Sequence, residues 1–359
     1  FHCSSVGEFL SIVPLIEKLE VEKDIKNILI TTSTLSSSKI FDIFKFKKTF
    51  HQFYPIDNSL IINRFLNYWK PNAVFFVESE IWPEMLNILK KKKIKIFLLN
   101  ARISKKSFNR WKYLKDMGIN IFEVFDFIFP QNKETLNYLK YFRVKRMQIL
   151  GNLKFTETEK LNNYRFYKKN FYGRKILCAA STHNNEEEII SNIHLNLKKK
   201  VKNLLTIIIP RHTERIKEII GTLNHKKLNY ICHSERKKVK KNTDIYLVDT
   251  YGESKSFYSA SKVVFLGGSL IKRGGQNPLE AIRYGCYITH GKHIFNFTEI
   301  YNMLDKKKLS FEAKNLQQLN KIIFNLMTKK SNNKKEIINF KKIGTDILIK
   351  NFTKIRVLI

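Results

Sequence analysis

The sequence predicts an α/β protein built from two doubly wound domains that face each other across a cleft. Short apolar runs alternate with segments of helical period along almost the whole chain, which is typical of parallel sheets with crossover helices. A length of 359 residues exceeds the size at which one hydrophobic core usually stops growing. A polar stretch without a clear apolar period, residues 156–174, interrupts the alternation near the middle and is the expected linker.

The first domain is expected at residues 1–155. Its strands are predicted where apolar residues form short runs, and its helices where apolar residues recur every three or four positions. After a first strand that ends near His2, the expected strands are Asn27–Thr32, Ala73–Val77, Ile94–Asn100 and Phe127–Pro130. The expected helices are Glu8–Leu19, Leu60–Tyr68, Ile81–Lys91 and Lys133–Tyr141.

The second domain, residues 175–359, repeats this rhythm and is expected to end in helices. Its expected strands are Lys175–Ala180, Leu204–Ile209, Ile245–Val248, Lys262–Leu266 and Cys286–His290. Its expected helices are Glu186–Leu197, Glu214–Leu223, Pro278–Arg283 and Phe297–Leu304. In open parallel sheets ligands bind beyond the carboxyl ends of the strands, so functional residues are expected in the loops there.

The net charge of +35 would draw the protein to phosphate-bearing partners such as nucleic acid, anionic lipid or a phosphorylated glycolipid. A compositional bias of the genome toward Lys, Asn, Ile and Phe explains the surplus equally simply. No ribonucleoprotein-type aromatic motif, zinc spacing or helix-turn-helix pattern accompanies the charge, so nucleic acid is not expected as a partner.

The four cysteines are far apart and the nine histidines are scattered, so neither a disulfide framework nor a structural zinc site is expected. No apolar run approaches the roughly 20 residues that a membrane-spanning helix needs. The chain begins at Phe1, inside a motif, and we expect that a preceding targeting or anchoring segment is absent from it.

Polar, glycine-bearing motifs follow the expected strands at eight places. They are Ser5–Glu8, Glu78–Pro83, Asn100–Ser104, Gly151–Phe155, Ser181–Glu187, Pro210–Arg215, Asp249–Glu253 and the block Gly267–Glu280. Each has a simpler explanation: a first-turn carboxylate such as Glu8, an N-cap such as Ser181, a first-turn proline at Pro278, or a surface charge. The gathering of all eight at one kind of edge favours a ligand-binding function.

Taken in order, these segments resemble the transferases of 3-deoxy-D-manno-octulosonic acid (Kdo) in lipopolysaccharide assembly. The family motifs SVGE, ExELWP, NARxS, GNLKF, STHxxEE, PRHxxR, DTxGE and GGS…GGxNPLE correspond to the eight segments above. The resemblance implies two Rossmann-like domains of the glycosyltransferase-B architecture. It also implies transfer of Kdo, with inversion, from CMP-Kdo to a lipid A precursor on the cytoplasmic face of the inner membrane.

The resemblance also implies roles for individual residues. It assigns Glu8 as the general base, and Glu78 and Lys154 as groups that stabilise the transition state. The CMP-binding residues that it implies are Pro210, Arg211, Gly252, Glu253, Ser254, Asn277, Pro278, Leu279 and Glu280. The sequence has no DxD motif to hold a metal, so we expect metal-independent transfer without a cofactor. The first domain would bind the acceptor and the second the donor.

Several positions depart from the family pattern. Gln276 stands where the family usually has His, Ser254 replaces a usual Leu, and Lys292 replaces a usual Pro. The segment Thr31–Ser37 lacks the Pro and Gly of the family's TTxTPTG motif. A catalytically decayed relative therefore remains an alternative, as does another two-domain sugar-nucleotide enzyme such as a hexosamine transferase or an epimerase with a uridine donor.

In the segment Ile40–Phe53, Phe41, Phe44, Phe46 and Phe50 are mixed with Lys45, Lys47 and Lys48. This pattern predicts either an interfacial helix on an anionic membrane surface or a helix that packs its phenylalanines into the core.

Overall fold

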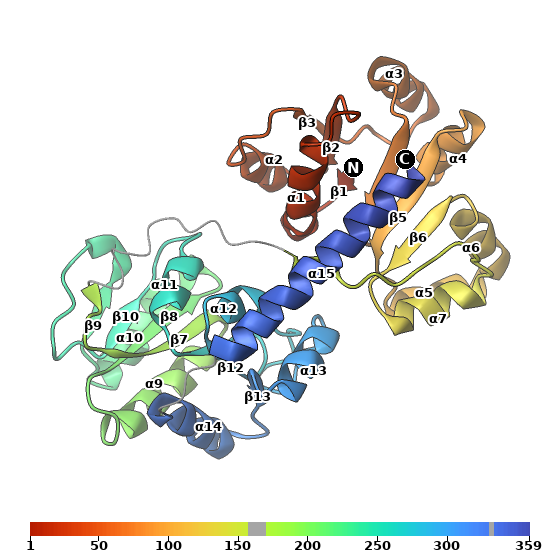
Figure 1. Ribbon diagram of the computed structural model, residues 1–359. Helices are drawn as coiled ribbons and strands as arrows, with labels where there is room; N and C mark the ends of the chain where they lie inside the picture. The colour runs from red at the N-terminus through yellow and green to blue at the C-terminus, as the bar shows by residue number, and fades with distance from the viewer. Residues whose placement is uncertain (157–169, 330–333) are drawn as a thin grey trace. The chain divides into compact units, whose positions relative to one another are not determined.

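The computed structural model describes residues 1–156, 170–329 and 334–359, and every count below refers to them. The chain divides into two compact units: the first comprises Phe1–Thr158 and Lys341–Ile359, and the second Glu159–Phe340. Each unit contains one parallel sheet with helices packed on it (Figure 1). The prediction of two doubly wound α/β domains is therefore confirmed.

The sheet of the first unit has six strands in the order β3-β2-β1-β4-β5-β6. The strands are β1 (His2–Cys3), β2 (Ile28–Thr32), β3 (Thr49–Phe53), β4 (Ala73–Val77), β5 (Lys95–Ala101) and β6 (Phe127–Pro130). The helices are α1 (Val6–Glu20), α2 (Leu35–Phe41), α3 (Ser59–Trp69), α4 (Pro83–Lys91), α5 (Lys105–Tyr113), α6 (Lys115–Phe122), α7 (Lys133–Tyr141) and the 3-10 turn η1 (Leu153–Phe155). The strand order reverses direction between β1 and β4, which is where doubly wound sheets bind ligands.

Successive residues of the central strands fill two separate cores, because side chains alternate between the faces of a sheet. On β4, Phe75 and Val77 join the core under α1, whereas Phe76 joins the core under α3 and α4. All three are buried, so this strand is apolar on both faces. That is why β4 and its neighbour β5 appear in the sequence as continuous apolar runs.

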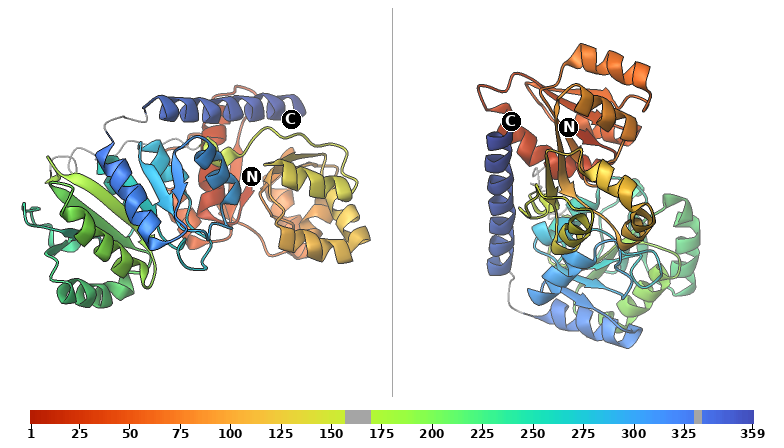
Figure 2. Two further views of the ribbon diagram at one scale, coloured as in Figure 1. Left: turned by 90° about the horizontal axis from the view of Figure 1, so that it is seen from below. Right: turned by 90° about the vertical axis from the view of Figure 1, so that its right-hand side faces the viewer.

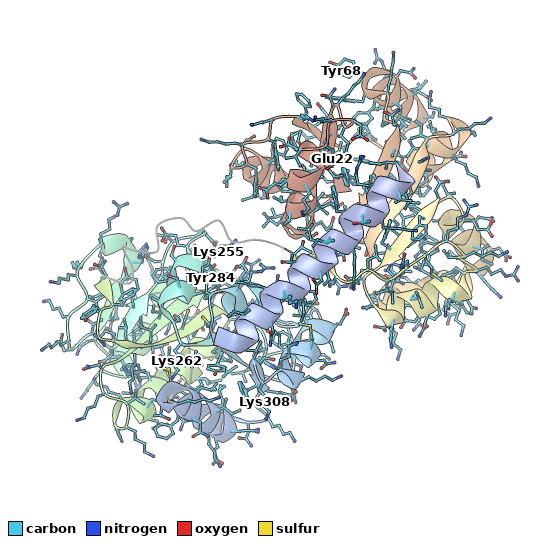
Figure 3. All side chains as sticks on the ribbon, in the orientation of Figure 1. Glu22, Tyr68, Lys255, Lys262, Tyr284 and Lys308 are labelled. Atoms are coloured by element: carbon cyan, nitrogen blue, oxygen red, sulfur yellow. The ribbon has the colours of Figure 1, made fainter. Side chains whose placement is uncertain are left out.

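The long C-terminal helix α15 (Lys334–Leu358) ends in the first unit (Figure 2). Ile355 is fully buried in the core under α1, and Phe352 packs against the same core. At the surface, Arg356 Nε lies 3.1 Å from Oε2 of Glu22, a residue labelled in Figure 3. We expected residues 341–359 in the second domain, but this apolar stripe packs on the sheet of the first.

The segment Ile40–Phe53 is not a helix, which corrects both interpretations of it. Helix α2 ends at Phe41, and β3 begins at Thr49. Phe41, Phe44 and Phe46 lie partly buried against the core under α1, whereas Phe50 and Phe53 are 48% and 43% exposed. The helical pattern is interrupted because β3 pairs in register with β2, whose backbone hydrogen bonds override local helix preference.

The sheet of the second unit has seven parallel strands in the order β13-β12-β11-β7-β8-β10-β9. The strands are β7 (Lys175–Thr182), β8 (Leu204–Pro210), β9 (Tyr230–Cys232), β10 (Ile245–Leu247), β11 (Val263–Leu266), β12 (Tyr287–His290) and β13 (Ser310–Glu312). The helices are α9 (Glu186–Lys198), α10 (Ile216–His225), α11 (Ser254–Ala260), α12 (Leu279–Arg283), α13 (Thr298–Lys306) and α14 (Leu316–Thr328), with 3-10 turns η2 (Thr213–Arg215) and η3 (His233–Glu235). The order reverses between β7 and β11.

Most of the expected linker 156–174 lies outside the described residues, which omit 157–169. The described part of this linker, residues 170–174, belongs to the second unit. Phe171 is buried, and the Arg174 guanidinium donates to the carbonyl oxygens of Leu204 (2.7 Å) and Thr243 (2.6 Å). Among the described residues, no helix has both the length and the apolar character that crossing a membrane requires.

Candidate active site

Glu8 lies in the first turn of α1, directly after β1 and at the reversal point of the first sheet. Ser5 caps this helix by accepting a hydrogen bond from the Glu8 N–H (3.3 Å), and the Ser4 N–H donates to Glu8 Oε2 (2.7 Å). Burial, and after it the negative charge of Glu78, raises the pKa of Glu8 to about 7. A carboxylate with this pKa can accept a proton near neutral pH.

Glu78 follows β4, the strand beside β1, and is 6% exposed. Its backbone has φ +63°, a left-handed conformation that is strained for a residue other than glycine. Its N–H donates to Leu99 O (2.9 Å) and its carbonyl accepts from Arg102 N–H (3.1 Å), so β5 holds this conformation. The Glu78 Oε1 lies 2.5 Å from Lys154 Nζ, in an ion pair whose side chains are 7% and 17% exposed.

Two asparagines hold the turn that carries Lys154. Asn100 is 1% exposed, and its Oδ1 accepts a hydrogen bond from the Leu153 N–H (3.0 Å). Asn152 Oδ1 accepts from the Lys154 N–H (2.9 Å). The sequence placed both residues in motifs but did not indicate this supporting role, because residues 100 and 152 meet only through the tertiary fold.

A second group that the sequence did not assign surrounds Glu80. Its Oε2 accepts from Trp82 Nε1 (2.9 Å) and lies 3.2 Å from His2 Nε2. The His2 ring packs against the tilted ring of Tyr54, with the ring centroids 3.8 Å apart. Burial alone would raise the pKa of Glu80, but the hydrogen bonds from His2, Ser4 and Trp82 hold it below its usual value. Glu80 is therefore a carboxylate kept ionised beside Glu8, whose pKa it helps to raise.

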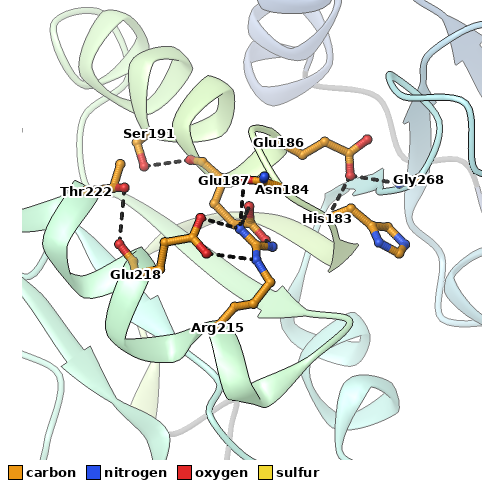
Figure 4. A network of polar contacts seen from close by, with 9 residues as sticks. All are labelled: His183, Asn184, Glu186, Glu187, Ser191, Arg215, Glu218, Thr222 and Gly268. Atoms are coloured by element: carbon orange, nitrogen blue, oxygen red, sulfur yellow. Dashed lines mark hydrogen bonds and ion pairs between the residues drawn. The ribbon is translucent and has the colours of Figure 1, made fainter.

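In the second unit, the Glu186 carboxylate joins two loops at the point where the strand order reverses, between β7 and β11. Glu186 is fully buried, and its Oε2 accepts from the backbone N–H groups of His183 (3.0 Å) and Gly268 (2.8 Å), as Figure 4 shows. Its Oε1 accepts from the Leu270 N–H (3.1 Å). A Cβ at Gly267 would collide with the backbone carbonyl of Ser181, so glycine is required for this close approach of the two loops.

The residues expected to bind CMP gather at the carboxyl ends of strands in this unit. Pro210 ends β8 and Gly252 follows β10, whereas residues 277–280 follow β11 and lead into α12. Arg211 is exposed. Its backbone N–H donates to Thr182 O (2.9 Å), so its backbone is fixed beside the loop that carries His183.

The same structure limits how some of these residues could bind a ligand. Leu279 is fully buried, so its side chain is not available to a ligand. Asn277 Oδ1 accepts from the Leu279 N–H (3.1 Å). The Glu253 Oε2 lies 2.5 Å from His233 Nε2 and accepts from Thr250 Oγ1 (3.1 Å). Ser254 opens α11, and Pro278 immediately precedes α12.

The departures at Thr31–Ser37 and Gln276 are accommodated locally. Thr34 caps α2 by accepting from the Ser37 N–H (3.2 Å), and the two hydroxyls lie 2.8 Å apart, so Ser37 supplies a hydrogen-bonding partner at the helix start. Gln276 uses its backbone carbonyl to accept from Tyr301 Oη (2.9 Å), a bond that does not depend on the side chain.

Among the side chains that the structure describes, no three or more of His, Cys, Asp or Glu are grouped so that they could hold a metal ion.

Two parallel-sheet units of this kind define the class of proteins with the glycosyltransferase-B fold. A UDP-GlcNAc 2-epimerase from Neisseria meningitidis has the same fold, with a TM-score of 0.65 and 14% identity over 99% of this chain and 97% of that chain.

Sequence comparison then identifies the family. The family model described as 3-deoxy-D-manno-octulosonic-acid transferase (kdotransferase) matches residues 1–157. The Kdo transferase of Haemophilus influenzae is 34% identical over 84% of this chain and 72% of its own length, and that of Rickettsia bellii is 33% identical over 98% and 84%. The chain belongs to the Kdo transferase family and is a glycosyltransferase of lipopolysaccharide biosynthesis.

Proposed function

We propose that this chain transfers Kdo from CMP-Kdo to the lipid A precursor lipid IVA, with inversion and without a metal or cofactor. The observation that carries the proposal is the position of Glu8, a half-buried carboxylate with a pKa of about 7 next to the Glu78–Lys154 ion pair. The reaction requires a group that removes a proton from the acceptor hydroxyl as the hydroxyl attacks the anomeric carbon, and Glu8 supplies it.

In this mechanism the first unit binds the acceptor. Glu8 accepts the hydroxyl proton, the acceptor oxygen bonds to the anomeric carbon of Kdo, and the bond to the CMP phosphate breaks on the opposite face, which inverts the configuration. The Glu78 carboxylate stabilises the positive charge that develops on the sugar ring, and Lys154 stabilises negative charge. Their mutual ion pair orients both side chains before substrate arrives.

The second unit binds the donor. Arg211 is the cation for the leaving phosphate, and the backbone of the glycine-rich loops lets the nucleotide approach closely. Because an arginine neutralises the leaving group in this scheme, we expect transfer to continue when chelators remove divalent cations.

Arg211→Ala should weaken CMP binding by about 1.5–3 kcal/mol, because a charge-assisted hydrogen bond to phosphate is lost. Isothermal titration calorimetry measures the change directly. Lys217→Ala, which removes an exposed cation of α10, is the matched control and should leave the affinity unchanged. Equal affinities of wild type and Arg211→Ala would place the phosphate elsewhere.

The decisive experiment for the proposed function is a transfer assay with CMP-Kdo generated in situ and lipid IVA, followed by mass analysis. We expect one or more mass increments of Kdo on the acceptor. Turnover with UDP-linked sugars instead would favour the hexosamine transferase or epimerase alternative. CMP binding without transfer would favour a catalytically decayed relative.

We further propose that the enzyme works at the cytoplasmic face of the inner membrane, because its acceptor is an amphiphile that carries phosphates. The exposed lysines Lys45 and Lys47 lie between α2 and β3, next to the exposed Ile43 and Phe50. Lys48 is different, because its Nζ donates to the carbonyl oxygens of Glu22 and Ile25 within the unit.

Replacing both Lys45 and Lys47 by glutamine should weaken sedimentation with anionic vesicles roughly tenfold or more, since each basic residue near such a surface contributes about 1 kcal/mol. Added salt should weaken the wild-type binding in the same way. The control is Lys199→Gln with Lys202→Gln, two exposed lysines of the second unit. If both pairs have the same effect, the loop between α2 and β3 has no special role.

A further inference from the structure

Two side chains, those of His183 and Arg273, converge on the bare Cα of Gly268, just after β11. A Cβ built there would lie 3.2 Å from His183 Cδ2, 3.3 Å from His183 Nε2 and 3.3 Å from Arg273 Cβ. Gly268 adopts φ +66°, and Glu186 fixes both its N–H and that of His183. The His183 ring (Figure 4) and the start of the Arg273 side chain therefore flank one point on a rigid loop.

This point carries a surplus of positive charge. Burial lowers the pKa of His183, and the charges of His212, Arg273, Arg211 and Arg215 lower it further. Among these guanidiniums, Arg215 is neutralised by ion pairs with Glu187 (2.8 Å) and Glu218 (2.9 Å).

The other two guanidiniums remain uncompensated. Within the described part of the chain, Arg211 and Arg273 form no ion pair, and both are exposed. Glu186, a buried carboxylate of this region, directs its oxygens to three backbone N–H groups instead. Two cations flanking a histidine without neutralising carboxylates suit a ligand with more than one negative charge.

The donor of the proposed reaction has this property. In CMP-Kdo the anomeric carbon carries both the phosphate ester oxygen and the carboxylate of the sugar acid, so two anions are attached to one carbon. A site with a single cation would leave one of them desolvated and unpaired, which is costly. Nucleotide sugars without a carboxyl group at the anomeric carbon need only the first cation.

We propose that Arg273, supported by the His183 ring, binds the carboxylate of the Kdo moiety, while Arg211 binds the phosphate. Arg273 is then the residue that selects a nucleotide-activated ulosonic acid over an ordinary nucleotide sugar. This inference rests on the proposed function and deepens it by assigning the two anions of the donor to two different loops. Arg211 follows β8, whereas Arg273 follows β11, so the anomeric carbon would lie between them near Gly268.

The test compares CMP, which lacks the carboxylate, with CMP-Kdo. Arg273→Gln should raise the KM for CMP-Kdo about 10- to 100-fold, as the loss of a charge-assisted contact does, and change the CMP dissociation constant less than about twofold. Arg211→Gln should weaken both. Lys272→Gln, the exposed neighbour, should change neither. Free Kdo should compete with CMP-Kdo on wild type and lose this effect on Arg273→Gln.

Two results would overturn the inference. If Arg273→Gln weakens CMP and CMP-Kdo in parallel, Arg273 contacts the nucleotide; if it weakens neither, Arg273 lies outside the donor site. Far-ultraviolet circular dichroism of the exposed Arg273 variant excludes misfolding as the cause. A wild-type protein that fails to bind CMP at all would contradict the proposed donor itself, a result distinct from a failure confined to Arg273.

Discussion

Glu8→Gln is expected to lower the rate of Kdo transfer by about 10²–10⁴-fold, the usual contribution of a general base. Glutamine preserves the size of the side chain and the acceptor oxygen for the Ser4 N–H, but it cannot take up the hydroxyl proton. A transfer assay at saturating CMP-Kdo measures the loss. CMP affinity should stay unchanged, because the donor residues belong to the other unit.

The pH dependence gives an independent check on the same residue. Only ionised Glu8 can act as base, so the rate of wild type should fall about tenfold per pH unit below a pKa of about 7. Glu78→Gln removes a negative charge that raises this pKa, and the acid limb of its profile should therefore move to lower pH. If the acid limb of the Glu78→Gln profile does not move, the group that titrates in this profile is not Glu8.

Glu8→Gln should lower the activity without lowering the stability of the folded protein. The pKa of Glu8 is higher in the folded state, about 7, than its ordinary value of 4.5, so ionising it disfavours folding as the pH rises between these values. At pH 8 the glutamine variant should unfold at a temperature equal to or above that of wild type. A large loss of stability would mean that low activity reflects misfolding.

Lys154→Met is expected to destabilise the protein by about 3–5 kcal/mol, the usual cost of breaking a buried ion pair from one side. The Glu78 carboxylate is 7% exposed and would lose its cation. Transfer should fall as well, because unbalanced charge at Glu78 would raise the pKa of Glu8 further and leave less of the base ionised at pH 7. Chemical denaturation measures the stability change.

Two controls make this prediction specific. The double variant Glu78→Gln with Lys154→Met removes both charges and should recover part of the lost stability. Lys237→Met breaks the pair with Glu235, in which the lysine is 70% exposed, and should change stability far less than Lys154→Met, because solvent screens an exposed pair. Equal losses at Lys154 and Lys237 would show that burial does not strengthen the Glu78–Lys154 pair.

Particular elements show how far the sequence could predict the fold. Strands Ala73–Val77 and Phe127–Pro130 and helix Lys133–Tyr141 were predicted to the residue, because each is apolar in the period that its buried faces require. Helices at the C-terminus were expected without bounds, and α14 and α15 are those helices, whereas strand β3 was not predicted. Strand β3 has only one buried residue, Thr49, so its sequence lacks the apolar run that marks an inner strand.

Some residues of the candidate site could likewise be predicted from the sequence, and others became apparent only in the structure. Glu8, Glu78, Lys154 and Arg211 were predicted as site residues from the family resemblance of motifs at strand ends. Parallel strands bring their carboxyl-end loops to one edge of a sheet. Asn100, Glu80, His2 and Glu186 act through partners distant in the sequence. The sequence contains no signal for such pairings, because they depend on which loops become neighbours.

By itself, the sequence determined the two-domain α/β class and the family, because hydrophobic periodicity and short motifs are local properties of the chain. Only the tertiary structure decided that residues 341–359 complete the first unit, and that Ile40–Phe53 divides between a helix end and an edge strand. It alone also brought Lys154 to Glu78, and Arg273 to His183. The physical reason is that burial, desolvation and charge pairing depend on contacts between segments far apart in the chain. These contacts form only when the chain folds, so their energies cannot be obtained from the local sequence.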